Sequence, residues 1–257
     1  MIKITASEVN KLRKQTGAGM MDCKNALVDS KGDFDKAIDI LRKKGQKIAA
    51  KRADRSASEG VVISNVNSSK NLGIIVSLNC ETDFVAKNED FIKLANSLLD
   101  LAIKNETTTI EKLNSLEFKN GKSVEDTIIE QTGVIGEKLE LSLKSINTEF
   151  VSCYIHAGSR LASMVGFDKK LDENIAKDIA MQIAAMNPIA IDKDSVSEDT
   201  INKEIEIGKD LAKQEGKPEN MLDKIALGRL NKFFKENTLL SQTFIKDSKM
   251  SVSKYIA

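Results

Sequence analysis

Few side chains in this sequence could carry out covalent chemistry. There is one histidine, His156, and the three cysteines, Cys23, Cys80 and Cys153, do not follow a metal-ligand spacing. A thiol enzyme that uses Cys80 or Cys153 with His156 is one interpretation. However, the residue beside Cys80 is Glu81, and a neighbouring acid does not activate a thiol. An odd number of cysteines is also typical of a protein from a reducing compartment.

Other patterns of enzymes and of membrane proteins are missing from the sequence as well. The Gly17-Ala18-Gly19 stretch leads into two methionines, whereas a phosphate-binding loop leads into Lys and then Ser or Thr. We therefore expect a protein that binds a partner without covalent catalysis, cofactor or metal. No apolar run reaches about 18 residues, and the N-terminus resembles neither a signal nor a transit segment, so we expect a cytoplasmic protein without membrane contact.

Two stretches of the sequence are too distinctive for a general interpretation. They read LRKQTGAGMMDCKNAL over residues 12–27 and NCETDFVAK over residues 79–87. Both resemble the bacterial translation elongation factor Ts family, and the order of the predicted parts resembles that family from about residue 2 to residue 257. The resemblance implies a guanine nucleotide exchange factor that binds the GTPase elongation factor Tu and promotes GDP release during translation elongation.

The spacing of apolar residues predicts the elements that must position these motifs. Three short helices are predicted within residues 5–45, the third ending at Gly45. Two tandem units, each a β-hairpin followed by a helix, are predicted over 60–104 and 150–186. A further helix is predicted from Ser123 to about Leu139, and a last one from Ser248.

A helical hairpin is predicted over residues 196–237, with a narrow seam of apolar and small residues. The predicted seam positions are Ile201, Ile205, Gly208, Ala212, Met221, Ile225 and Gly228. Such a hairpin is either an oligomer contact or an arm for a partner, and a dimer of complexes through it is one expectation.

Together with the resemblance, these elements predict an α+β fold with an N-terminal module similar to ubiquitin-associated domains, a two-part core with antiparallel sheets and an inserted antiparallel helical hairpin. The predicted parts are a three-helix module at 1–45, a basic helical linker at 46–59, the first half of the core at 60–147, its second half at 148–190 with 238–257, and the hairpin at 191–237.

The resemblance implies that the second motif enters the GTPase near its magnesium and phosphate site. The residues implied are Thr82, Asp83, Phe84 and Val85. Phe84 would act as a wedge between two helices of the partner, and Asp83 would help to disrupt the magnesium shell. Taken from the residues alone, Phe84 could equally belong to the core and Asp83 could cap the following helix.

Seven other residues are implied to contact the partner. They are Arg13, Met20, Met21, Lys24, Ile135, Gly136 and His156. Each group has a structural alternative: core packing for Met20, a helix C-terminus for Ile135 and Gly136, and a structural turn for His156.

A basic stretch at residues 42–55 supports an alternative interpretation, in which the chain is an RNA- or ribosome-associated binding protein. It holds seven basic residues against one acid, Asp54. Charge runs of this kind are common on solvated helices, which is the alternative interpretation. The net charge of +1, the 4% aromatic content and the absence of Trp count against nucleic-acid binding.

Overall fold

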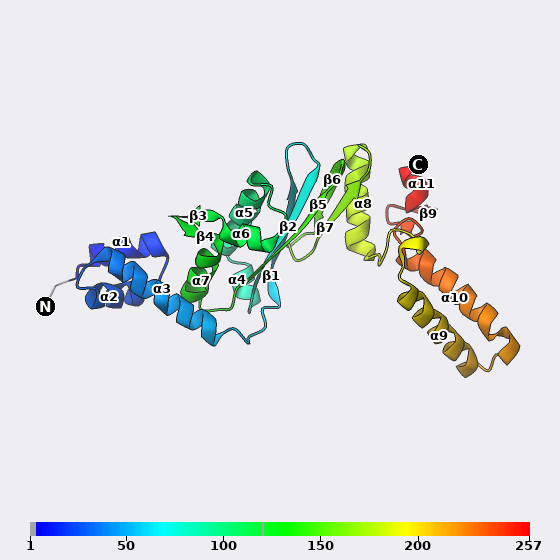
Figure 1. Ribbon diagram of the computed structural model, residues 1–257, viewed down its shortest axis with the longest axis horizontal. Helices are drawn as coiled ribbons and strands as arrows, with labels where there is room; N and C mark the ends of the chain where they lie inside the picture. Colours follow the sequence, from blue (N-terminus) through cyan, green and yellow to red (C-terminus); the bar gives the residue numbers. More distant parts are fainter. Residues whose placement is uncertain (1–3, 120) are drawn as a thin grey trace.

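The structure is a computed structural model in which residues 4–119 and 121–257 are described. Helices and short antiparallel strands alternate along an elongated molecule (Figure 1), so the predicted α+β class is confirmed. No helix within these described ranges is long and apolar enough to cross a membrane.

The N-terminal module consists of α1 (Ala6–Thr16), α2 (Met20–Asp29) and α3 (Phe34–Lys51). A capping box between Thr5 and Glu8 begins α1, and Gly17 ends it in the left-handed conformation with φ of 72°. The three helices share a small apolar core formed by Val9, Leu12, Ala18, Cys23, Ala26, Leu27 and Ala37.

The prediction that Gly45 ends the third helix is wrong, because α3 continues through it to Lys51. Gly45 is buried where α3 crosses α7 (Val124–Ile135). A Cβ atom on Gly133 of α7 would lie only 2.5 Å from the Cα atom of Gly45. The two glycines thus permit a close helix crossing, so the first part of the predicted linker is a helix docked on the core.

The first half of the core is built on a three-stranded antiparallel sheet with the order β1-β2-β5. Its strands are β1 (Glu59–Val66), β2 (Leu72–Cys80) and β5 (Glu140–Asn147). Alternate residues of β1 and β2 are buried together with the apolar face of α5 (Glu89–Lys104). The short helices α4 (Asp83–Ala86) and α6 (Ile110–Ser115) complete this half of the core.

One boundary and one strand differ from the sequence prediction in this half. The helix predicted from Ser123 to about Leu139 ends at Ile135, because Gly136 adopts a left-handed cap with φ of 79°. The chain then enters β5, which we did not predict. Its apolar residues alternate with charged and polar ones over a short span, and pairing with β2 is what makes it a strand.

The second half of the core confirms the predicted hairpin and helix. It contains β6 (Phe150–Ile155), β7 (Ala162–Phe167) and α8 (Glu173–Met186). The β6–β7 ribbon packs closely on the three-stranded sheet, since a Cβ on Gly73 of β2 would lie 2.5 Å from Cγ1 of Val151.

The similarity between the two halves extends further than predicted. In the first half, the ribbon β3 (Glu117–Lys119) and β4 (Lys122–Ser123) leads into α7, whose N-cap is Ser123. In the second, β8 (Thr243–Phe244) and β9 (Asp247–Ser251) lead into α11 (Val252–Ile256), capped by Ser251. Val124 and Val252, which follow the two caps, are both fully buried. The last helix therefore begins at Val252 and not at Ser248.

The helical hairpin consists of α9 (Glu198–Gln214) and α10 (Leu222–Asn237). The 3₁₀ turn η1 (Lys193–Ser195) precedes α9, and η2 (Glu219–Met221) lies between the two helices. It extends away from the sheets at the far end of the molecule (Figure 1). Gly208 lies in the seam, where an added Cβ would be 3.1 Å from Cα of Ala226. Gly228 is exposed, and so is Met221, so their predicted seam positions are wrong. The buried positions of α10 are Leu222, Ala226 and Leu230.

Candidate functional site

The second sequence motif runs from the end of β2 through Glu81 and Thr82 into α4, and Phe84, the second residue of α4, faces solvent. Residues 81–84 are called the Phe84 loop below. The Phe84 side chain is 83% exposed, the largest fraction among the described large apolar residues that lie on the surface. Val85 and Ala86, the next two residues, pack against the core instead. The structure thus excludes the alternative that Phe84 is a core residue.

Asp83 is the first residue of α4 and does not cap it. The cap is Thr82, whose Oγ1 accepts from the Val85 N–H at 3.5 Å. The Asp83 carboxylate pairs with Lys87 Nζ at 2.6 Å, and this hydrogen bond is the main reason that its pKa lies below the usual value. Asp83 is therefore ionised near neutral pH and remains partly exposed beside Phe84.

Two carboxylates hold this loop against the segment that joins α7 to β5. Glu137 accepts hydrogen bonds from the backbone N–H groups of Glu81 and Thr82. In return, Glu81 accepts from the backbone N–H of Lys138 and from Arg52 Nη1, each at 2.7 Å. Sequence analysis did not find this arrangement, because no local spacing connects residues that are 29 to 57 positions apart.

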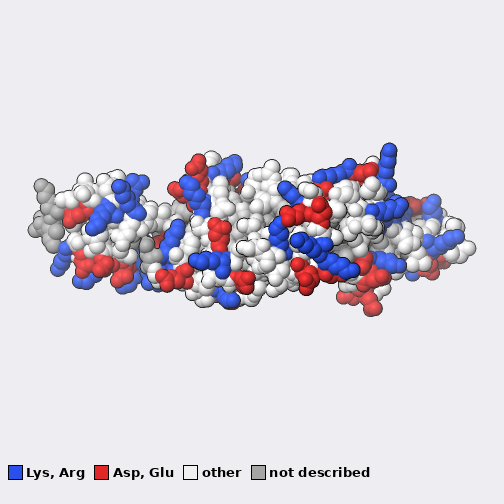
Figure 2. All heavy atoms as spheres, turned by 90° about the horizontal axis from the view of Figure 1, so that it is seen from above, with Lys and Arg blue, Asp and Glu red and all other residues white. Residues whose placement is uncertain are grey.

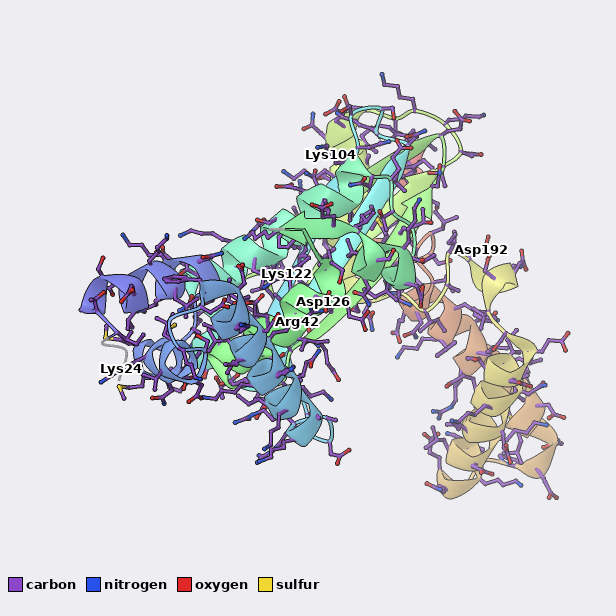
Figure 3. The ribbon with its side chains drawn as sticks, turned by 60° about the vertical axis from the view of Figure 1, so that its left-hand side comes forward. Lys24, Arg42, Lys104, Lys122, Asp126 and Asp192 are labelled. Carbon is purple, nitrogen blue, oxygen red and sulfur yellow. The ribbon has the colours of Figure 1, made fainter. Side chains whose placement is uncertain are left out.

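The implied contact residues of the N-terminal module are on its surface. Met20 and Met21 are 53% and 62% exposed, so the core alternative for Met20 is excluded. Arg13 and Lys24 are exposed as well. Lys24 lies on the outer side of the module, away from the core sheet (Figure 3).

The module and the core are joined by more than the glycine crossing. Arg42 of α3 and Asp126 of α7 point toward one another (Figure 3) and form an ion pair with an N···O distance of 2.5 Å. Arg52, at the end of α3, reaches Glu81 beside the Phe84 loop. The exposed methionines are thus held in a defined position relative to Phe84.

Ile135 and Gly136 form the C-terminus of α7, as the structural alternative predicted. Ile135 is half-buried and lines a hollow of about 380 Å³ between the module and the core. Gly17 of the first motif and Val85 of the second line the same hollow. The two motifs, distant in sequence, therefore border one surface depression.

His156 lies at the β6–β7 turn and is exposed, with Nδ1 at 3.1 Å from the Tyr154 hydroxyl. The turn is attached to β1, since the Val62 N–H donates to the Ser159 carbonyl at 2.6 Å. After Lys87, nearby Arg160 of this turn further lowers the pKa of Asp83. The His156 turn therefore lies near the Phe84 loop.

The cysteines do not support the thiol-enzyme alternative. Cys80 is buried, and burial followed by the negative charge of Glu137 raises its pKa to about 11. Burial also raises the pKa of Cys153 to about 11. Within residues 4–119 and 121–257, no group of three or more His, Cys, Asp or Glu is arranged to hold a metal ion.

Alkylation tests this assignment. Both thiols should stay protonated between pH 7 and 8, because their pKa values lie well above that range and only the thiolate reacts. We expect iodoacetamide to leave Cys80 and Cys153 of the folded protein unmodified, whereas the urea-unfolded protein should react fully. Mass spectrometry of both samples measures this, and rapid modification of native Cys80 would contradict the burial described here.

The basic stretch contributes several of its charges to internal ion pairs. Besides Arg42 and Arg52, Lys44 pairs with Asp22 of α2 at 2.5 Å. Acidic and basic side chains are interspersed over the surface seen in Figure 2, and no broad basic face appears there. These observations favour a structural role for much of the stretch over an RNA contact.

The fold and the loop define a class of protein that presents an exposed aromatic side chain on a support held by the core. The family model described as Elongation factor TS matches residues 81–257. Elongation factor Ts of Christiangramia forsetii is 57% identical, covering 100% of this chain and 93% of that protein. Those of Flavobacterium psychrophilum and Cytophaga hutchinsonii are 52% and 49% identical, each covering 100% of this chain and 93% and 94% of their own lengths. The chain belongs to the elongation factor Ts family.

Proposed function

We propose that this protein is a guanine nucleotide exchange factor for elongation factor Tu and promotes GDP release during translation elongation without covalent catalysis. Family membership supports the activity, and the exposure of Phe84 on an anchored loop is the structural observation that carries the mechanism. A large apolar side chain that is 83% exposed gains its burial from a partner, as the anchors of protein interfaces do.

In this mechanism, the Phe84 ring inserts between two helices of the GTPase near its magnesium and phosphate site. Burial of the ring contributes about 2–3 kcal/mol, which offsets the displacement of a partner helix. Mg²⁺ is held by few protein ligands and demands near-ideal geometry, so a small displacement weakens it. The neighbouring Asp83 carboxylate adds a negative charge at the same place.

Exchange then follows from linked binding equilibria. If the protein binds the nucleotide-free GTPase more tightly than the GDP-bound form, it weakens GDP binding by the same factor. GDP leaves faster, and GTP in excess enters and displaces the protein by mass action. This accounts for an accelerated step without a catalytic constellation.

The remaining predicted contacts belong to the same proposal. Arg13, Met20, Met21 and Lys24 contact the GTP-binding domain, and Ile135 with Gly136 adds a second contact. His156, on the turn near Phe84, faces the other domains of the partner. The helical hairpin pairs two such complexes.

The direct test is to mix the protein with elongation factor Tu loaded with a fluorescent GDP. We expect stopped-flow measurements to show faster release that saturates with increasing protein concentration. The spontaneous release rate without this protein is the control. Release that stays at the spontaneous rate at every concentration would contradict the proposed function.

The exposed methionines Met20 and Met21 should contribute to the affinity for elongation factor Tu and not to the maximal rate of GDP release. The double variant Met20→Ser, Met21→Ser is expected to raise the half-saturating protein concentration about thirtyfold, because two apolar contacts of about 1 kcal/mol each are lost. Folding should be unaffected, since both side chains are exposed. Met186→Ser, at a methionine that is 43% exposed on α8, is the matched control. A fall in the maximal rate at unchanged affinity would contradict this assignment.

A further inference from the structure

We propose that Glu137 is a positioning residue for Phe84. Its carboxylate accepts hydrogen bonds from Glu81 and Thr82, and this contact, called the clasp below, holds the Thr82 peptide so that Phe84 is presented to the partner. The inference rests on the proposed exchange function. It concerns a side chain that does not itself need to touch elongation factor Tu.

The Glu137 carboxylate uses both oxygens on the Phe84 loop. Oε2 accepts from the N–H groups of Glu81 and Thr82, both at 3.0 Å, and Oε1 accepts from the Thr82 hydroxyl at 2.7 Å. Hydrogen bonds to an ionised acceptor are stronger than those between neutral groups. The three bonds fix the chain at the point where β2 ends at Cys80 and α4 begins at Asp83.

The Thr82 hydroxyl passes this restraint on to α4. While it donates to Glu137, its oxygen accepts from the Val85 N–H at the first turn of the helix. A helix of four residues is too short to be stable through its own hydrogen bonds. The direction of Phe84, the second residue of α4, therefore depends on the anchors at the two ends of that turn.

A second carboxylate closes the clasp from the other side. Glu81 Oε1 accepts from the Lys138 N–H, and this hydrogen bond, followed by the one from Arg52, lowers the pKa of Glu81. Each loop thus offers a carboxylate to the backbone of the other loop. Arg52 is the C-cap of α3, so the clasp also connects the N-terminal module to the Phe84 loop.

Phe84 itself adds almost nothing to its own placement. With 83% of its surface exposed, the ring has few neighbours within the protein, and only the backbone determines where it points. Well-placed groups in functional sites depend on a supporting shell, and small misplacements lower rates strongly. Loss of the Glu137 clasp should therefore reduce the maximal exchange rate, as loss of the ring does.

The test combines exchange kinetics with amide hydrogen exchange of the free, full-length protein. We expect Glu137→Ala to raise the hydrogen-exchange rates of the Glu81 and Thr82 amides at least tenfold and to lower the maximal stimulated GDP release about tenfold. Glu137→Gln, which retains an acceptor oxygen, should stay within about threefold of wild type in both measurements. Glu140→Gln is the matched control. It removes the same kind of charge from a nearby exposed residue whose carboxylate pairs with the Lys138 side chain, so it should leave both measurements unchanged.

A double-mutant cycle separates positioning from general stability. In the Phe84→Ala background, Glu137→Ala should lower the maximal rate no further, because no ring is left to position. Unchanged amide exchange in Glu137→Ala, or a full additional loss of rate in the double variant, would overturn the proposal. Should Glu137→Ala fail to fold, Glu137→Asp, whose shorter side chain withdraws the carboxylate from the Thr82 peptide, takes its place in the same cycle. A wild-type protein that fails to accelerate GDP release would refute the proposed function, whereas the amide measurement reports on the clasp independently.

Discussion

Replacing Phe84 by alanine is expected to lower stimulated GDP release from elongation factor Tu at least tenfold. The ring contributes about 2–3 kcal/mol on burial, and each 1.4 kcal/mol corresponds to about a factor of ten. The loss should appear in the maximal rate at saturating protein, because the wedge acts on the nucleotide-bound complex. Stopped-flow release of a fluorescent GDP measures it directly.

The same variant should fold as the wild type does. Phe84 makes little contact with the rest of the protein, so the thermal midpoint should stay within about 2 °C. Ile189→Ala, at an isoleucine that is 54% exposed after α8, is the matched control and should leave release unchanged. Near wild-type stimulation by Phe84→Ala would remove the wedge from the mechanism, even if exchange activity itself were established.

Gly133→Ala is expected to have the largest effect on the placement of the N-terminal module. The added methyl group would lie 2.5 Å from the Cα atom of Gly45, and a backbone atom cannot turn aside as a flexible side chain can. Helices α3 and α7 must then separate. We expect a loss of about 1–3 kcal/mol in the free energy of unfolding, as for other overpacked sites, measured by urea denaturation.

Gly228→Ala provides the matched control for this change. Gly228 also lies within a helix, but a Cβ there would meet no other described atom within 4 Å. Alanine should stabilise that exposed position by about 0.5–1 kcal/mol. The two glycine variants should therefore change stability in opposite directions. An equally stable Gly133→Ala protein would show that the close crossing does not hold the module.

Separation of α3 from α7 should also affect the position of the Phe84 loop. Arg52 ends α3 and pairs with Glu81, so a displaced helix removes one anchor of the loop. For Gly133→Ala we accordingly expect weaker binding to elongation factor Tu together with faster proteolysis between Lys51 and Glu59.

Several elements were predictable because their signals are local. The Thr5–Glu8 capping box, the Gly17 helix end and the β6–β7 hairpin depend on neighbouring residues alone, and the structure confirms them. The two motifs were enough to identify the family. The exposure of Phe84 fits the role that the resemblance implied, but sequence alone left its burial open.

The errors arose where one residue type serves two purposes. A glycine ends a helix at Gly17 and permits a helix crossing at Gly45, and local sequence does not distinguish the two. In the hairpin, Gly208 lies in the seam while Gly228 faces solvent. Which face of α10 meets α9 depends on how the two helices pack together. The spacing of apolar residues within α10 alone does not reveal it.

By itself, the sequence determined the family, the α+β class, the order of most elements and the short motif that ends in an aromatic. Those properties follow from local periodicity, caps and distinctive residue runs. Only the tertiary structure decided that Phe84 points outward, that α3 docks on α7 and that Glu137 and Glu81 clasp the loop. These features depend on backbone approach and on hydrogen bonds between residues 55 to 84 positions apart, and such contacts leave no periodic signal in the chain.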